Sequence, residues 1–111
     1  MITRRVTNHL STCDLADCTA PIVAKALAMS DTTLRRKLRR EGATFAELLQ
    51  AERVRRVETA IAERPSINAK RLAGICGYNE TNHFYRAFKG WFGNKYTQYR
   101  SATYTTQEPA P

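Results

Sequence analysis

The feature that most constrains the fold of this chain is an internal repeat. The segment IVAKALAMSDTTLRRKL resembles the later segment INAKRLAGICGYNETNHFYRAF, with one additional residue in the middle of the second copy. Each copy predicts a short helix, a tight turn and a second helix. The matched pairs are Ala24 with Ala73, Leu34 with Phe84, Arg36 with Arg86, and Leu38 with Phe88. The two small alanines would let the paired helices approach closely, which favours two helix-turn-helix units.

The rest of the chain also favours helices. It has no sustained apolar/polar alternation and no Asn-Gly hairpin turn. We expect an all-α fold of about seven helices, with N-caps at Ser30, Thr44, Ser66 and Asn79 and helix ends at Gly42, Pro65, Gly77 and Gly93. The seventh helix is the short segment KYTQYRSA. In this division, residues 1–43 form the first unit, 44–65 a linker helix, 66–102 the second unit and 103–111 a disordered tail.

The linker helix carries apolar residues at helical spacing and a cluster of arginines. The apolar residues predict its buried side: Phe45, Leu48, Leu49, Val54, Val57 and Ile61. We expect Arg53, Arg55 and Arg56 to form ion pairs with Glu52 or Glu58, or to face a partner.

The charge of the chain points to a polyanionic partner. Of its 111 residues, 18 are Lys or Arg and 10 are Asp or Glu, which gives a net charge of +8. A charge this far from neutral indicates partners rather than fold, and the candidates are nucleic acid, an anionic membrane surface or an acidic protein. No apolar run reaches the ~20 residues that a membrane span needs, and no signal peptide is evident.

The cysteine count predicts reduced thiols. Cys13, Cys18 and Cys76 are an odd number in a chain without a secretory signal, which favours a reducing cytoplasm. Cys13 and Cys18 have no second pair to complete a zinc site, so we expect no metal. Cys76, between Ile75 and Gly77, is expected in the core.

With these residues in view, the chain resembles the DNA-binding domain of the AraC/XylS family of transcription regulators. The resemblance runs from about Thr19 to Arg100. It is strongest over SINAKRLAGICGYNETNHFYRAFKGWFG and the following YTQYR. It implies that the second helix of each unit enters the major groove of DNA, so that one chain reads successive grooves on one face of the duplex.

Both the resemblance and the helix faces select the same candidate base-reading residues. They are Thr32, Arg35 and Arg36 in the first unit and Thr81, Asn82, Tyr85 and Arg86 in the second. Arg can bond guanine and Asn adenine bidentately, and Thr or Tyr can contact the thymine methyl group. Like charges repel at Arg35/Arg39 and Arg36/Arg40, with only Glu41 expected nearby to offset them, and an acidic partner would remove that cost. We expect phosphate contacts from Ser30, Arg39, Arg40, Asn79, Lys89, Lys95 and Arg100.

The sequence thus predicts a sequence-specific regulator that binds promoter DNA. By resemblance it would be an activator that contacts RNA polymerase, located in the cytoplasm at the nucleoid. The alternative is a non-specific basic module, architectural or RNA-binding, that uses charge alone. No phosphate loop, paired carboxylates or Ser/His/Asp set is evident, so we expect no enzyme and no cofactor. The chain has no room for an N-terminal sensing or dimerisation domain; it is a minimal regulator or a fragment, and we favour a fragment.

Overall fold

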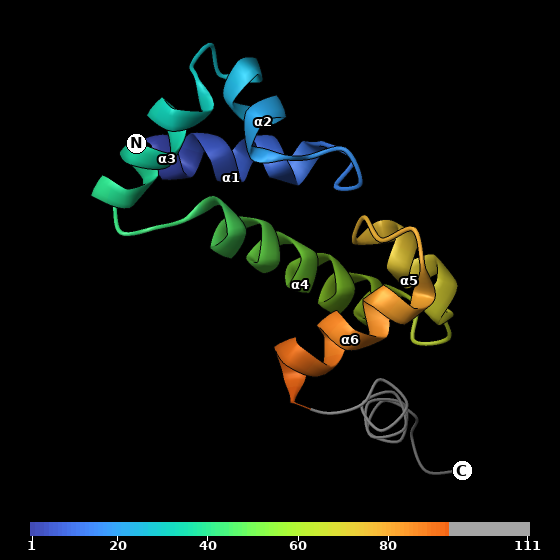
Figure 1. Ribbon diagram of the computed structural model, residues 1–111. Coiled ribbons are helices and arrows are strands. Elements are labelled where there is room, and N and C mark those ends of the chain that lie inside the picture. Colours follow the sequence, from blue (N-terminus) through green and yellow to red (C-terminus); the bar gives the residue numbers. More distant parts are fainter. Residues whose placement is uncertain (94–111) are drawn as a thin grey trace.

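Six helices make up the described part of the chain, residues 1–93, in the computed structural model (Figure 1). They are α1 (Ile2–Thr12), α2 (Ala20–Ala26), α3 (Asp31–Arg40), α4 (Phe45–Glu63), α5 (Ala69–Ile75) and α6 (Thr81–Phe92). These residues contain no strand, so the all-α prediction is confirmed. None of the six helices is both long and apolar enough to cross a membrane. The expected seventh helix and the tail 103–111 lie outside the described residues.

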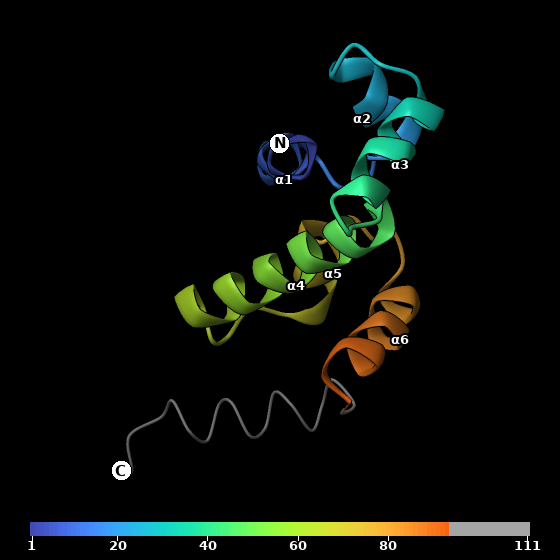
Figure 2. The same cartoon turned by 90° about the vertical axis from the view of Figure 1, so that its left-hand side faces the viewer.

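The buried side chains form two hydrophobic clusters, one toward each end of α4. In both views of the ribbon, α2 and α3 lie above α4 and α6 lies below it (Figures 1 and 2). The first cluster joins α1, α2 and α3 to Phe45 at the start of α4. The second joins Val57 and Ile61, near the end of α4, to α5 and α6. We had expected Leu48, Leu49 and Val54 to be buried, but they are only half-buried. The two clusters occupy different ends of α4 and neither encloses its whole apolar side.

The repeat in the sequence is also a repeat in the structure. Three of the four matched pairs are buried, and the fourth, Arg36 with Arg86, faces outward. Both short helices end in the same left-handed turn: the Met29 amide donates to the Ala24 carbonyl at 3.0 Å, and the Tyr78 amide to the Ala73 carbonyl at 2.8 Å. The residue before each donor has positive φ, 60° at Ala28 and 87° at Gly77. The extra residue of the second copy lies in the stretch between this turn and the next helix.

Two of the four expected N-caps are confirmed. The Ser30 hydroxyl accepts the Thr33 amide at 3.1 Å, and the Thr44 hydroxyl accepts the Glu47 amide at 3.2 Å. The prediction for Ser66 is wrong, because the chain makes one more turn and the Asn68 side chain caps α5 by accepting the Arg71 amide at 2.8 Å. The prediction for Asn79 is wrong too, since α6 begins one residue later, after Glu80, with no side-chain cap. The expected ends at Gly42 and Gly93 are confirmed by their positive φ.

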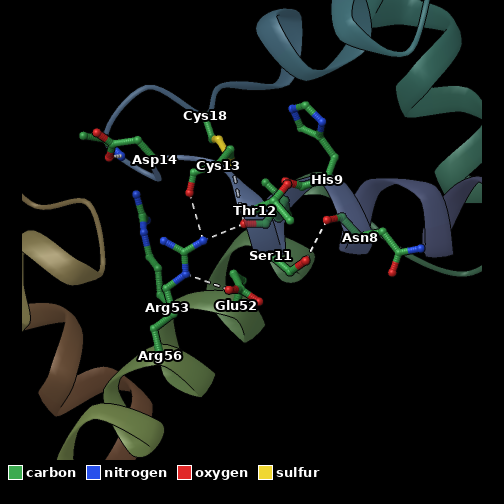
Figure 3. The surroundings of a disulfide bond; sticks show 12 residues. Asn8, His9, Ser11, Thr12, Cys13, Asp14, Cys18, Glu52, Arg53 and Arg56 are labelled. Carbon is green, nitrogen blue, oxygen red and sulfur yellow. Dashed lines mark hydrogen bonds and ion pairs between the residues drawn. A yellow bond between two sulfur atoms is a disulfide. The ribbon is translucent and has the colours of Figure 1, made fainter.

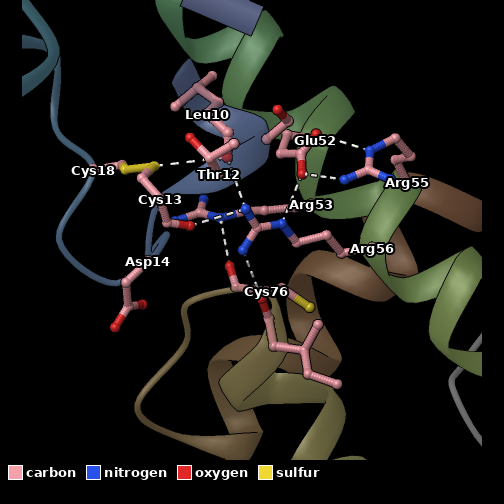
Figure 4. Close-up of polar contacts among 12 residues, drawn as sticks. Leu10, Thr12, Cys13, Asp14, Cys18, Glu52, Arg53, Arg55, Arg56 and Cys76 are labelled. Atoms are coloured by element: carbon pink, nitrogen blue, oxygen red, sulfur yellow. Dashed lines mark hydrogen bonds and ion pairs between the residues drawn. A yellow bond between two sulfur atoms is a disulfide. The ribbon is translucent and has the colours of Figure 1, made fainter. Parts of the chain in front are cut away.

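Arg56 forms hydrogen bonds to residues of three helices, α1, α4 and α5 (Figure 4). Its guanidinium donates to Glu52 Oε2 at 2.7 Å within α4, and to the carbonyl oxygens of Leu10 and Cys13 at 2.7 and 2.9 Å. A longer hydrogen bond, 3.5 Å, reaches the Ile75 carbonyl at the end of α5. The last carbonyls of a helix have no partner within it, so one partly buried cation satisfies acceptors at the ends of α1 and α5. One side chain on α4 therefore contacts both the first and the second unit.

Arg53 and Arg55 flank this contact with different partners (Figure 4). Arg55 forms a bidentate pair with Glu52, at 2.9 and 2.7 Å, as the sequence predicted for this cluster. Arg53 does not form the expected ion pair with Glu52 or Glu58. Its guanidinium donates to the Cys76 carbonyl at 3.0 Å and lies 4.6 Å from the centre of the Tyr78 ring. Arg53 thus holds the turn of the second unit.

The loop between α1 and α2 lies directly against that same turn. A Cβ atom on Gly77 would come within 2.6 Å of the Leu15 carbonyl carbon and 2.7 Å of the Ala16 nitrogen. Leu15 itself is buried. The backbones of the two units therefore meet at Gly77, where any side chain would separate them.

The cysteines correct one expectation and confirm another. Cys13 and Cys18 are joined by a disulfide, so the prediction of three reduced thiols is wrong for this pair (Figure 3). The intervening loop folds back on itself, with the Asp17 amide donating to the Asp14 carbonyl at 3.1 Å, which brings the two cysteines together. Cys76 is free and fully buried, as expected, and burial raises the pKa of its thiol to about 12.

We predict that Gly77→Ala destabilises the chain more than Gly42→Ala does. Both glycines have positive φ, which costs alanine about 1–2 kcal/mol, but only Gly77 also faces the Leu15 backbone, while nothing lies within 4 Å of the Cβ position at Gly42. Overpacking should add about 1–3 kcal/mol at Gly77. Urea unfolding measures the free energy of unfolding of both variants. Equal losses of this free energy would show that the close approach at Gly77 does not contribute to the destabilisation.

We also predict a pH-dependent loss of stability in Glu52→Gln. Hydrogen bonds from Arg55 and Arg56 hold the pKa of the buried Glu52 carboxyl below its ordinary value of 4.5, against the opposing effect of burial. Its stabilising contribution is therefore complete above pH 4.5 and is lost as the pH falls below that value. The variant should unfold about 2 kcal/mol more easily at neutral pH, and this gap should shrink in acid.

Glu58→Gln is the matched control for that measurement. Glu58 lies on the same helix, is exposed, and forms no ion pair within residues 1–93. The control should stay within about 0.5 kcal/mol of the parent. A gap for Glu52→Gln that does not change between neutral and acid pH would contradict the role given to its charge.

Candidate nucleic-acid interface

The outer face of α3 carries a row of basic side chains. Leu34 and Leu38 are fully buried, so the helical period turns the intervening residues away from the core. The side chains exposed on this helix include all of those predicted for it: Thr32, Arg35, Arg36, Arg39 and Arg40. The helix is held at its start by Ser30, whose exposed hydroxyl accepts the Thr33 amide and donates to Thr33 Oγ1 at 2.8 Å.

The acid that offsets this charge is not the expected one. Asp31 pairs with Arg35 at 3.0 Å, with the Arg35 side chain 60% and the Asp31 side chain 38% exposed. Glu41 instead accepts the backbone amides of Ile2 and Thr3, at 3.0 and 2.9 Å. Hydrogen bonds from Thr3 and Ile2 hold the pKa of the Glu41 carboxyl below its ordinary value. Glu41 therefore caps α1, and the arginines of α3 keep most of their unbalanced charge.

The ion pair between Asp31 and Arg35 leaves Arg35 available to another partner. Exposed pairs of this kind contribute at most about 1 kcal/mol, and salt weakens them further. A phosphate or a guanine edge can therefore compete for Arg35 at little cost. The neighbouring Arg36 forms no ion pair with any of the described residues.

The outer face of α6 occupies the matched position in the second unit but carries different side chains from the outer face of α3. Phe84 and Phe88 are fully buried and anchor the helix to the second cluster. The predicted residues Asn82, Tyr85, Arg86 and Lys89 are exposed, and Thr81 is half-buried at the start of the helix. This face thus offers one amide, one phenol and two cations, whereas the face of α3 is almost wholly cationic.

The remaining predicted residues fall at the edges of these two faces or beyond them. Asn79 is exposed in the turn before α6 and does not cap the helix. Lys95 and Arg100 lie outside the described residues. Within residues 1–93 no group of three His, Cys, Asp or Glu side chains is placed to hold a metal ion.

What the sequence missed is how the two faces are fixed relative to each other. The spacing of Glu52 and Arg56 predicts an ion pair along one helix, and that pair forms at 2.7 Å. No sequence signal predicts that the same guanidinium also binds the Leu10 and Cys13 carbonyls of α1. Distant parts of the chain thereby share one rigid contact.

Comparison with protein families and known proteins agrees with this architecture. A family model described as a helix-turn-helix domain matches residues 23–102. The transcriptional regulator VqsM of Pseudomonas aeruginosa is 37% identical over 79 residues, which are 71% of this chain and 24% of that protein. The transcriptional regulator YdeO of Escherichia coli K12 is 33% identical over 81 residues, 73% of this chain and 28% of that protein. The chain thus spans about a quarter of the length of these curated relatives.

Solved structures share the whole helical arrangement. A DNA-binding transcriptional dual regulator from Escherichia coli K-12 superposes with a TM-score of 0.83 at 27% identity, covering 94% of this chain and 93% of that one. The C-terminal domain of AraT, a response regulator from Geobacillus stearothermophilus, superposes with a TM-score of 0.77 at 30% identity, covering 91% and 84%. The family match, the relatives and the paired helix-turn-helix units lead to one conclusion: this chain belongs to the AraC/XylS-type family of helix-turn-helix transcription regulators.

Proposed function

We propose that the chain is the DNA-binding part of a transcription regulator and reads a long, asymmetric duplex site with α3 and α6 in successive major grooves. The observation that carries this proposal is the presence of two outward-facing polar helices at matched positions, one in each of two units that Arg56 links through α1 and α5. Successive major grooves on one face of B-DNA are about 34 Å apart. The molecule, whose principal extents are 55 × 25 × 22 Å, is long enough to span that distance.

The roles within the interface follow from side-chain chemistry. Arg36 and Arg86 occupy matched positions in the two units and suit bidentate bonds to guanine, while Asn82 suits adenine. Thr32, Arg35, Thr81 and Tyr85 complete the proposed base-reading set. Arg39, Arg40, Lys89, Ser30 and Asn79 would bind phosphates, which fix the register but carry no sequence information. Lys95 and Arg100 remain in the proposed phosphate set.

The wider role rests on the family rather than on the geometry of this chain. Activation through RNA polymerase, a cytoplasmic location at the nucleoid, and a sensing or dimerisation domain elsewhere in the full protein are proposals of this kind. The alternative is a basic module that binds nucleic acid without sequence preference. Non-specific binding needs only positive charge. The face of α6 also exposes Asn82 and Tyr85 beside its cations, and these side chains can bond base edges.

Binding to three duplexes separates the two functions. The first is recovered from a random pool by selection with this chain, the second is its scrambled version, and the third has five base pairs inserted between the two contacted segments. We expect the selected duplex to bind at least about 10³-fold more tightly than the scrambled one at physiological salt. The insertion turns one groove to the opposite side of the duplex and should cost most of that preference. Equal binding to all three would establish the non-specific module instead.

Arg86→Ala and Lys89→Ala should differ in kind. Loss of a base contact at Arg86 should weaken binding to the selected duplex by about 1–3 kcal/mol and relax the preference at one base pair. Loss of a phosphate contact at Lys89 should weaken all duplexes alike and lower the slope of log K against log salt by about one unit. Titrations at several salt concentrations, on duplexes varied one base pair at a time, measure both effects. An Arg86 variant that behaves like the Lys89 variant would remove Arg86 from the base-reading set.

A further inference from the structure

The loop between α1 and α2 holds a chemical feature that the proposed function does not use. Cys13 and Cys18 lie at its two ends and are joined by a disulfide (Figure 3). Both residues precede residues 23–102, the part that matches the family model, so the pair is not a feature of the shared helix-turn-helix core. We propose that Cys13 and Cys18 form a reversible dithiol–disulfide site that controls how firmly the second helix-turn-helix unit is held against the first.

The loop that the disulfide closes lies at the contacts between the two units, so the bond can affect those contacts. The carbonyl of Cys13, the residue directly after α1, accepts from Arg56, as does the Leu10 carbonyl of α1 (Figure 4). Between the cysteines, the backbone of Leu15 and Ala16 makes the close approach to Gly77. One of the first unit's two contacts with Arg56, and its contact with the second unit's turn, thus begin at, or lie within, the stretch that the disulfide closes, while the Leu10 contact lies outside it. Closing the bond fixes this backbone, and opening it lets the loop move away from both contacts.

The chain also separates this pair from its third cysteine. Cys13 is half-buried at the surface of the first cluster, and Cys18 is 6% exposed. Cys76 is 0% exposed, and burial raises the pKa of its thiol to about 12. Thiol–disulfide exchange needs an accessible thiolate, so Cys76 is excluded and Cys13 is the accessible partner of the pair.

The exchange is a two-electron step with a low-molecular-weight disulfide, RSSR, as the oxidant. The Cys13 thiolate attacks one sulfur of RSSR, the S–S bond of RSSR breaks, and one RS⁻ leaves. The Cys18 thiolate then attacks the Cys13 sulfur of the mixed disulfide and releases the second RS⁻. The two protons from the protein thiols end on two RSH molecules. A small dithiol reverses the sequence and is itself oxidised to a disulfide.

The test compares the parent chain with Cys13→Ser and Cys76→Ala, each treated with oxidised glutathione or with dithiothreitol. Alkylation after unfolding, read by mass spectrometry, should label only Cys76 in the oxidised parent and all three cysteines in the reduced parent. Hydrogen exchange at the Tyr78 amide, which donates to Ala73 within the turn, should be slower in the oxidised parent by about fivefold or more. Cys76→Ala should show the same slowing, and Cys13→Ser should show none.

DNA affinity is the second readout, and it rests on the proposed function. The duplex recovered by selection should bind the oxidised parent about fivefold or more tightly than the reduced one, because the two recognition helices are then held in one geometry. If no duplex is preferred in either state while Tyr78 exchange still responds to oxidation, the proposed function fails and the redox site stands. Equal Tyr78 exchange in both states, or a stable glutathione adduct at Cys13 in place of the internal bond, would overturn the redox proposal.

Discussion

The structure depends on one partly buried cation near the centre of α4. Arg56 satisfies carbonyl oxygens at the ends of α1 and α5 while Glu52, 5% exposed, balances its charge. Taking a guanidinium out of water is costly unless its donors find partners, and here the partners come from α4, the end of α1 and the end of α5. The contact is therefore satisfied in only one arrangement of the two units. Hydrophobic burial alone, spread over two separate clusters, would not specify that arrangement so narrowly.

The two copies of the repeat contain the same left-handed turn but place different residues in it. Both short helices end in a left-handed turn, but the first copy places Ala28 there and the second places Gly77. Alanine tolerates this conformation at a modest cost when its surroundings are open. Glycine is required in the second copy because the Leu15 backbone occupies the space that a Cβ would need. The difference between the copies thus marks where the units touch.

The two outer faces differ in the chemistry they offer to DNA. The face of α3 is dominated by arginines, and its one acid, Asp31, is already paired with Arg35. The face of α6 mixes an amide and a phenol with two cations. Under the proposed function, electrostatic attraction would come mainly from the first unit, while the second would supply more varied hydrogen bonding to base edges.

Much of the fold was predictable from short-range signals. The repeat, the helical spacing, the caps at Ser30 and Thr44, and the end at Gly93 depend on residues a few positions apart, and the structure confirms them. The predictions for Ser66 and Asn79 failed because several polar residues near a helix start compete, and the exact path of the turn decides which side chain reaches the free amide. Apart from the half-buried Thr81, the predicted side chains on the outer faces of α3 and α6 are exposed, since the buried stripe of each helix fixes its opposite side.

Local signals in the amino-acid sequence are enough to predict an all-helical chain, a repeated helix-turn-helix unit, and two matched polar faces that point away from the core. Periodicity, caps and small residues encode these features locally. The partners that meet across long sequence separations follow from the folded path: Arg56 with the Leu10 carbonyl, Arg53 with Tyr78, and Glu41 with the start of α1. The pairing of Cys13 with Cys18, five residues apart, likewise depends on how the loop between them folds. Backbone carbonyls and amides are the same at every position in a sequence, so which of them a side chain meets is set by the folded path of the chain.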